Sequence, residues 1–146
     1  MPTVRDLVRL KNNPQIWSIS PDATVFEAMK LLAEKRIGAV LVMQGGKIEG
    51  ILSERDCVRK VDIEGKSSRN VKVKEIMTSH VLYIDITQPL EDCMAIMTEK
   101  KVRHLPVFDG DQLVAIVSSG DVLKEIISDQ KFMLDQLTRY ISGGGR

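Results

Sequence analysis

Hydrophobic and polar residues follow two different periods along the chain. Short apolar runs at Ile16–Ile19 and Val81–Ile84 end at turn-forming or polar residues and predict strands. Each run is followed by a segment with apolar residues at helical spacing, which predicts a helix. The residues that carry the helical spacing are Val25, Ala28, Met29 and Leu32 in the first segment and Leu90, Cys93, Met94 and Met97 in the second.

Beyond the first helix, the pattern changes back to that of strands. The continuous apolar run Gly38–Met43 is suited to a strand buried on both faces. Gln44-Gly45-Gly46-Lys47 then supplies the chemistry of a hairpin turn, and Ile48–Leu52 predicts the returning strand. Ser53 follows as a helix N-cap with Asp56 at the third helical position, a capping box. The predicted order of elements is β-α-β-β-α.

The chain contains this unit twice. A shift of 65 positions (121 − 56 = 65) places Ser53-Glu54-Arg55-Asp56 on Ser118-Ser119-Gly120-Asp121. Units of this size bury little core alone, so we expect an α/β fold in which two β-α-β-β-α repeats pack sheet to sheet about a pseudo-twofold axis. The predicted boundaries are 1–70 for the first repeat, 71–128 for the second and 129–146 for a C-terminal helix with a flexible tail.

Composition narrows the classes of function. The net charge of +1 and the aromatic content of 4% argue against nucleic acid as the main partner. The longest apolar run is too short to cross a bilayer, and the charged N-terminus does not resemble a signal peptide, so we expect a cytoplasmic protein without a membrane partner. Two scattered histidines predict no metal site. No Ser-His-Asp set or Walker loop occurs, so we expect no enzyme activity.

The repeated Ser-x-x-Asp segment carries the clearest candidate chemistry. A carboxylate at the start of a helix, such as Asp56 or Asp121, can accept both hydroxyls of a ribose cis-diol. Ser53 and Ser118 can donate to a phosphate beside the free N–H groups of the helix. On spacing alone, the same segment is equally a capping box that contributes about 1 kcal/mol per cap.

Three sets of residues together resemble the CBS domain, named after cystathionine β-synthase. The first is the apolar strand ending in Ser-x-x-Asp, present as Gly50–Asp56 and Ala115–Asp121. The second is Lys101–Val107, which resembles the family's basic pair and proline before a strand. The third is Glu75–Thr78, which resembles the short opening helix. The resemblance covers residues 4–128 and implies a stand-alone tandem pair.

The family implies a binding site for an adenine nucleotide such as AMP, ATP, NAD or S-adenosylmethionine. Its basic pair corresponds to Arg103 and His104, which would meet the phosphate, while the first repeat has Gly38 and Ala39 at these positions. Arg55 would reach a second phosphate or only the solvent. The remaining candidates are Thr24 as a cap or ligand contact, Val40, Ile51 and Ile116 as apolar walls or ordinary core, and Pro106.

We therefore expect a non-catalytic regulatory module that binds AMP, ATP or NAD in the cleft between its repeats and acts on a protein that the sequence does not identify. The alternative is a dimerising interaction scaffold whose clefts are vestigial. A homodimer is expected because Phe132, Met133, Leu137 and Tyr140 share one helical face that a small module hardly buries alone.

Overall fold

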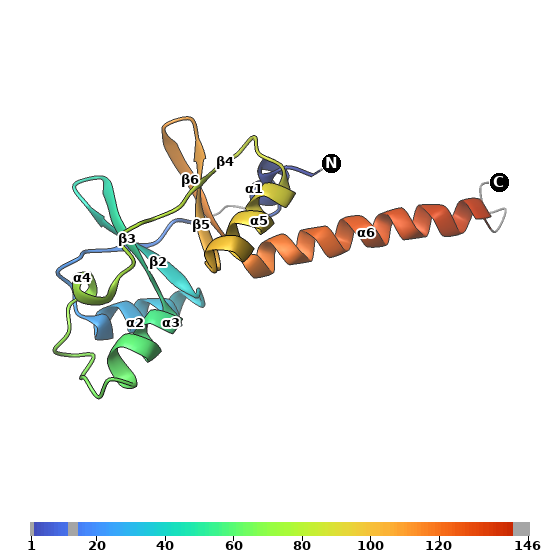
Figure 1. The fold of residues 1–146 in the computed structure, drawn as a ribbon. Coiled ribbons are helices and arrows are strands. Elements are labelled where there is room, and N and C mark those ends of the chain that lie inside the picture. The colour runs from blue at the N-terminus through green and yellow to red at the C-terminus, as the bar shows by residue number, and fades with distance from the viewer. Residues whose placement is uncertain (1, 12–14, 142–146) are drawn as a thin grey trace. The chain divides into compact units, whose positions relative to one another are not determined.

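The computed structural model describes residues 2–11 and 15–141, with the side chains of residues 140 and 141 left out. These residues form two compact units (Figure 1). Unit 2 consists of residues 16–82. Unit 1 combines the N-terminal residues up to 15 with the chain from residue 83 onward. Each unit has its own three-stranded sheet, so the predicted α/β fold class is confirmed.

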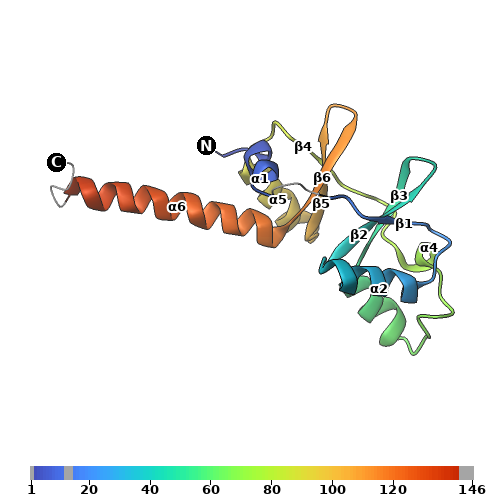
Figure 2. The ribbon, with the colours of Figure 1, turned by 180° about the vertical axis from the view of Figure 1, so that it is seen from behind.

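Unit 2 follows the predicted order with small changes at the element ends. Its elements are β1 (Ser18–Ile19), α2 (Val25–Lys35), β2 (Ala39–Gln44), β3 (Lys47–Ser53), α3 (Glu54–Cys57), the π-helical turn η1 (Val58–Asp62) and α4 (Val73–Ile76). The sheet order is β1-β2-β3, with β1 parallel and β3 antiparallel to β2. Helices α2 and α3 lie side by side against this sheet in Figures 1 and 2.

Unit 1 repeats this arrangement. Its elements are α1 (Val4–Leu10), β4 (Ile84–Asp85), α5 (Leu90–Lys100), β5 (His104–Asp109), β6 (Gln112–Ser118) and α6 (Ser119–Ile141). The sheet order β4-β5-β6 has the same directions as in unit 2. The duplication seen in the sequence is therefore also a duplication of strand topology.

Local signals explain where the long helices begin and end. Thr24 caps α2, because its side chain accepts a hydrogen bond from the N–H of Glu27 at 3.1 Å. Helices α2 and α5 both end at a residue in the left-handed conformation, Arg36 with φ 54° and Lys101 with φ 55°. These two residues occupy equivalent positions in the repeat, so the same backbone turn leads into β2 and β5.

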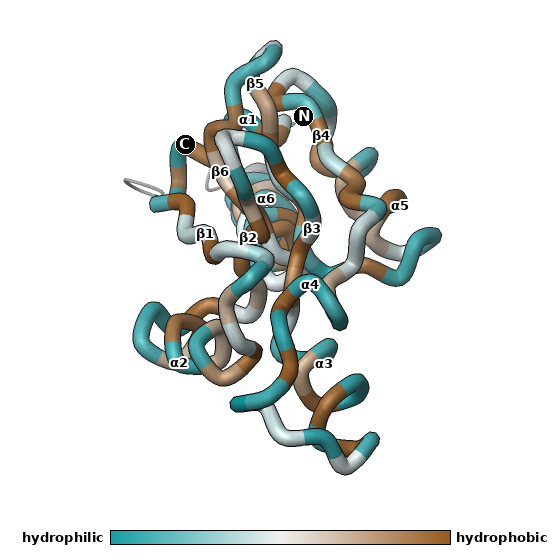
Figure 3. The backbone as a smooth tube through the Cα atoms, turned by 90° about the vertical axis from the view of Figure 1, so that its left-hand side faces the viewer, coloured by the Kyte–Doolittle hydropathy of each residue, from teal (hydrophilic) through white to brown (hydrophobic). Residues whose placement is uncertain are grey.

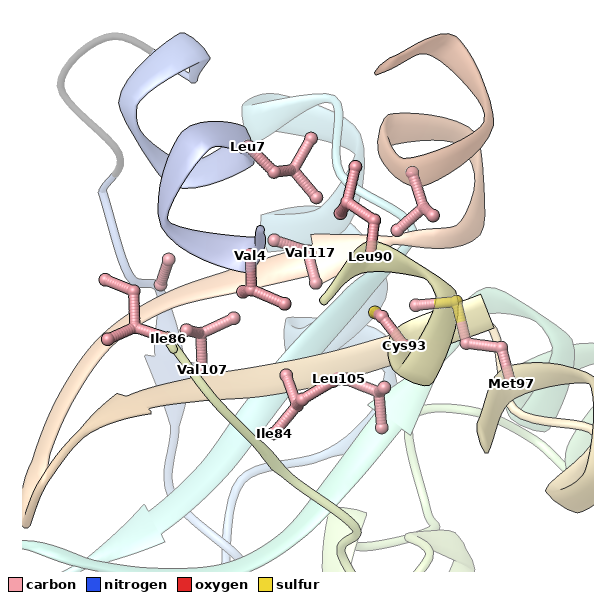
Figure 4. Packing of buried hydrophobic residues seen from close by; sticks show 12 residues of the cluster. Val4, Leu7, Ile84, Ile86, Leu90, Cys93, Met97, Leu105, Val107 and Val117 are labelled. Atoms are coloured by element: carbon pink, nitrogen blue, oxygen red, sulfur yellow. The ribbon is translucent and has the colours of Figure 1, made fainter. Parts of the chain in front are cut away.

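Each unit has its own hydrophobic core. In unit 1, Leu7 of α1 and Leu90 of α5 point toward each other above β5 and β6, which contribute Val107 and Val117 (Figure 4). In unit 2 the core lies between α2, the strands β2 and β3 and α4. Figure 3 shows the hydrophobic stretches of the strands and the hydrophilic tips of the hairpins between them.

The short opening helix of each repeat packs in the unit formed by the other repeat. Val4 and Leu7 of α1 are buried in the core of unit 1, whereas Val73 and Ile76 of α4 are buried in the core of unit 2. The compact units therefore differ from the boundaries 1–70 and 71–128 expected from the sequence. The reason is physical: an alignment shows that the helices are equivalent but not which core buries their apolar residues.

The C-terminal helix also differs from its predicted boundary. We expected a separate helix from residue 129, but α6 runs without a break from Ser119 to Ile141. Its first turns contribute Val122 and Ile126 to the core of unit 1. From Gln130 to Arg139 every side chain is exposed, so this half of the helix extends beyond the core of its unit (Figure 1). The side chain of Tyr140 and the predicted flexible tail lie outside the described residues.

Gly50 provides a test of this packing. A Cβ atom at Gly50 would lie 2.8 Å from the carbonyl oxygen of Thr78, whose backbone is held by two hydrogen bonds to Ile51. We expect Gly50→Ala to lower the free energy of unfolding by about 1–3 kcal/mol, because the backbone must shift. Urea denaturation measures this change.

The matched control is Gly120→Ala in the first turn of α6. The nearest atom to its added Cβ is 3.6 Å away, an ordinary contact. This variant should be as stable as the parent or up to about 1 kcal/mol more stable, because alanine favours helices. Equal stability of both variants would show that the backbone around Gly50 is not tightly packed.

Candidate functional site

Strand pairing in unit 1 brings the two predicted parts of the site together. His104, at the start of β5, lies opposite Ser118, at the end of β6. The N–H of Ser119 donates a hydrogen bond of 2.8 Å to the carbonyl oxygen of Arg103. The basic pair and the Ser-x-x-Asp segment, separated by about a dozen residues in sequence, therefore lie side by side at the start of α6.

Asp121 is fixed by its own backbone environment. One of its carboxylate oxygens, Oδ2, accepts a hydrogen bond from the N–H of Ser118 at 2.9 Å. Its own N–H donates to the hydroxyl of Ser118 at 3.1 Å, which completes the predicted capping box. The cap therefore exists, and the carboxylate that forms it is still 31% exposed.

Lys11, at the end of α1, also reaches this carboxylate. Its ammonium group lies 2.8 Å from Oδ2 of Asp121 and forms both a hydrogen bond and an ion pair with it. Partial burial acts to raise the pKa of Asp121, but the bonds from Lys11 and Ser118 outweigh burial and hold the pKa below its usual value. Asp121 is therefore a charged acceptor at neutral pH.

His104 is half-buried beside this group. Burial lowers the pKa of the imidazole below 6.5, the nearby Asp121 carboxylate acts to raise it, and the positive charges of Lys11 and Arg103 lower it further. His104 is therefore neutral at pH 7. Lys11, Arg103, His104 and Asp121 form what we call the unit 1 cluster, in which Lys11 pairs with the Asp121 carboxylate and the charges of Lys11, Arg103 and Asp121 all act on His104.

Unit 2 contains the same framework with different charges. Ala39 pairs with Ser53, and the N–H of Glu54 donates to the carbonyl oxygen of Gly38 at 3.0 Å. Asp56 completes the predicted capping box, since its Oδ2 accepts from the N–H of Ser53 at 3.0 Å and from the Ser53 hydroxyl at 3.1 Å. Gly38 and Ala39 supply no charge here, unlike Arg103 and His104 in unit 1.

Lys60 is the cation beside Asp56. Its ammonium group lies 3.3 Å from Oδ1 of Asp56 and donates to the carbonyl oxygen of Ile76 at 2.9 Å. The i, i+4 spacing of Asp56 and Lys60 is visible in the sequence and predicts such a pair. Lys11 lies 110 positions from Asp121, so no local pattern signals their contact. Neither lysine was among the site residues predicted from the sequence.

The remaining predicted site residues divide into two groups. Thr24 caps α2, and Val40 has no exposed surface in the core of unit 2, so both have clear structural roles. Ile51 and Ile116 remain partly exposed on equivalent strands, and Arg55 is exposed on α3. Pro106 is buried and pairs with Ile116 across β5 and β6. The use of these residues as ligand contacts stays a prediction.

Both cysteines are buried thiols. Burial raises the pKa of Cys57 and of Cys93 to about 11, so neither is a thiolate at neutral pH. Within residues 2–11 and 15–141, no group of three or more His, Cys, Asp or Glu side chains is arranged to hold a metal ion, and no helix is long and apolar enough to span a membrane.

The fold defines a class of protein built from two copies of a β-α-β-β-α unit. In each copy the last helix begins at a Ser-x-x-Asp segment. The model of the CBS domain matches residues 3–63 and 73–128, and the chain belongs to this family as a CBS domain pair. CBS-domain proteins are generally regulatory, and the matches indicate no catalytic family.

Relatives and solved structures support this assignment. A mitochondrial CBS domain-containing protein of Arabidopsis thaliana is 32% identical over 97% of this chain and 73% of its own. A structure of a protein with CBS domains from Burkholderia ambifaria is 43% identical, has a TM-score of 0.84 and covers 88% of this chain and 96% of its own. Another CBS domain pair, solved with 5′-methylthioadenosine and S-adenosyl-L-methionine, shares the fold with a TM-score of 0.74 at 23% identity, over 88% of this chain and 98% of its own.

The environment of His104 predicts how stability depends on pH. The pKa of His104 lies below 6.5 in the folded chain and near 6.5 in the unfolded chain. Above about pH 6.5 the imidazole is neutral in both states. As the pH falls below this value, the unfolded chain binds the proton first, so the free energy of unfolding decreases.

We therefore expect urea denaturation at pH 7.5 and pH 5.5 to show a smaller loss of stability in His104→Gln than in the parent. His80→Gln is the control, because His80 is an exposed histidine in the other unit. An equal loss in the parent and in His104→Gln would show that His104 gains its proton as easily in the folded chain as in the unfolded one.

Proposed function

We propose that this CBS domain pair is a sensor of adenine nucleotides and that its binding residues are those of the two Ser-x-x-Asp segments and the strands beside them. The single observation that carries this proposal is the Asp121 carboxylate, which is charged, partly exposed and paired with the ammonium group of Lys11. A neighbour with the same fold was solved with two adenosine-containing ligands, which supports the class of ligand.

The chemistry of the unit 1 cluster suits both ends of a nucleotide. The carboxylate of Asp121 accepts hydroxyl hydrogens, and the ribose presents two of them on adjacent carbons. Arg103 supplies a permanent cation for the phosphate, and His104 supplies an N–H donor even when it is neutral. AMP, ATP and NAD all carry these two features, so the cluster favours this group of ligands.

The two units are expected to contribute unequally to phosphate binding. Asp56 offers the same ribose acceptor as Asp121, but Gly38 and Ala39 replace the basic pair beside it. We therefore propose that the site containing Asp121 has the higher affinity for a phosphate-bearing ligand. The protein that such a sensor regulates, and its location in the cytoplasm, stay predictions.

Asp121→Asn tests the proposal. The amide keeps the size of the side chain and an oxygen acceptor for the N–H of Ser118, but it loses the charge that a ribose diol needs. We expect AMP to bind about 1.5–3 kcal/mol more weakly by isothermal titration calorimetry. AMP, ATP, NAD and S-adenosylmethionine are first compared by the rise in melting temperature that each gives the parent.

The matched control is Asp135→Asn, which removes an exposed carboxylate further along the same helix. This variant should bind AMP as the parent does. If none of the four ligands raises the melting temperature of the parent, the chain is not an adenine-nucleotide sensor. If AMP binds the parent and Asp121→Asn equally, the ribose acceptor lies elsewhere.

The second candidate function, a dimerising scaffold, is favoured by the exposed half of α6. Six large apolar residues of α6 are exposed. Five of them gather on one side of the helix by helical periodicity, and we call them the α6 stripe: Leu123, Ile127, Met133, Leu134 and Leu137. Phe132, which we expected on the same face, is exposed on the opposite side. Monomers rarely expose a contiguous apolar surface of this kind. We propose that a second copy of α6 covers the stripe in a homodimer.

Charges at the edges of the α6 stripe favour a parallel pair. By helical periodicity Lys124 and Lys131 border one edge of the stripe, and Asp129 borders the other. In a parallel pair related by a twofold axis, the basic edge of one helix faces the acidic edge of its copy. An antiparallel pair would place the two basic edges together, which costs energy.

Light scattering coupled to gel filtration tests the homodimer. Each buried leucine contributes about 1.5–3 kcal/mol, so the double variant Leu134→Glu and Leu137→Glu should be monomeric at micromolar concentration. Lys131→Glu should weaken the dimer, and the added change Asp129→Lys should restore it, because the pair of charges is then reversed. A monomeric parent would remove this proposal, and a failure of the second change to restore the dimer would exclude the parallel arrangement.

A further inference from the structure

Lys11 occupies the same carboxylate oxygen that a ribose would need. Oδ2 of Asp121 already accepts two hydrogen bonds, one from the N–H of Ser118 at 2.9 Å and one from the ammonium group of Lys11 at 2.8 Å. An oxygen of a carboxylate has two lone pairs, so Oδ2 has no acceptor site left. Among the described residues, none donates to Oδ1. In this state a ribose cannot place one hydroxyl on each carboxylate oxygen, which is the arrangement that holds both hydroxyls of a cis-diol side by side.

We propose that Lys11 makes the site in unit 1 select nucleotides over nucleosides by exchanging Asp121 for the phosphate of the ligand. This inference rests on the proposed function and adds to it Lys11, which caps the end of α1 and lies outside the Ser-x-x-Asp segment and the basic pair. For the ribose diol to place one hydroxyl on each oxygen of Asp121, Lys11 leaves Oδ2. Its ammonium group then needs another anion, and the phosphate of a nucleotide supplies one.

The structure supports a movable partner at this position. Lys11 is the residue that ends α1, and its side chain is 30% exposed, so the ammonium group is not enclosed by the core. A lysine side chain has a flexible four-carbon stem and no fixed donor geometry, unlike arginine. Asp121, in contrast, is held by the capping box and stays in place when Lys11 moves.

The positive charges of Lys11 and Arg103 decide which ligand favours the movement of Lys11 away from Asp121. The positive charges of Lys11 and Arg103 both act on the half-buried imidazole of His104, so these two cations lie near the same group. When Lys11 leaves Asp121 without a new anion, a positive charge remains beside Arg103 with nothing to balance it. A bound nucleoside has no charge that could balance this ammonium group. The phosphate of a bound nucleotide supplies about two negative charges that do so. Lys11 therefore opposes the binding of adenosine and supports the binding of AMP.

The comparison of adenosine and AMP in Lys11→Met tests this inference, because the two ligands should respond in opposite directions. The measurement uses the full chain in an Asp56→Ala background, so that the site containing Asp121 is studied alone. Methionine keeps an unbranched apolar stem without the charge. We expect adenosine to bind about threefold more tightly, since a partly exposed ion pair no longer competes, and AMP to bind about tenfold more weakly. Isothermal titration calorimetry measures both constants.

Lys74→Met is the matched control, because it removes a lysine that also forms an ion pair, with Asp22 at 3.1 Å, in the other unit. It should change neither constant. If both ligands bind the Lys11→Met variant as they bind the parent, or both change in the same direction, Lys11 does not select for phosphate and the inference is wrong, while the proposed function stands. If the Asp56→Ala background binds neither ligand, the site containing Asp121 does not bind AMP and this inference is wrong, whereas the proposed function fails only if none of the four ligands raises the melting temperature of the parent chain.

Discussion

Backbone pairing between a short opening helix and the turn before a long helix is the constraint on which both units depend. In unit 1 the N–H groups of Val4 and Arg5 donate to the carbonyl oxygens of Gln88 and Ile86. In unit 2 the N–H groups of Val73 and Lys74 donate in the same way to Ala23 and Pro21. These bonds satisfy helix N–H groups that would otherwise have no partner, and they hold the apolar residues of the short helix over the core.

The same constraint decides what lies beside each candidate ligand-binding carboxylate. Because α1 packs on the core of unit 1, Lys11, the residue that caps its C-terminal end, reaches Asp121, and a lysine 110 positions away becomes part of the unit 1 cluster. In unit 2 the equivalent cation comes from the turn that follows α3, as Lys60. The repeats therefore share a framework of strands and capping boxes and differ in where their positive charge comes from. This difference underlies the unequal affinities proposed for the two sites.

Helix α6 connects the candidate site with a surface outside the core. Its first turn forms the capping box of Asp121, its next turns pack on α1 and α5, and its remaining length carries the exposed α6 stripe. A helix with little tertiary packing is only marginally stable in water, so a covering partner would stabilise it. Binding at Asp121 and pairing along the stripe would then act on one continuous element.

The sequence by itself determined the elements, the duplication and the family. The hydrophobic periods located α2, α5 and the paired strands, and the spacing of Ser53 and Asp56 predicted a capping box that the structure confirms. These features depend on residues a few positions apart, so a local pattern contains them. Only the tertiary structure decided which core buries each opening helix, because α1 and α4 have equivalent apolar residues and their local sequence does not distinguish the two cores. It also decided that Lys11 pairs with Asp121, since that contact follows from the docking of α1 and leaves no trace in the local sequence.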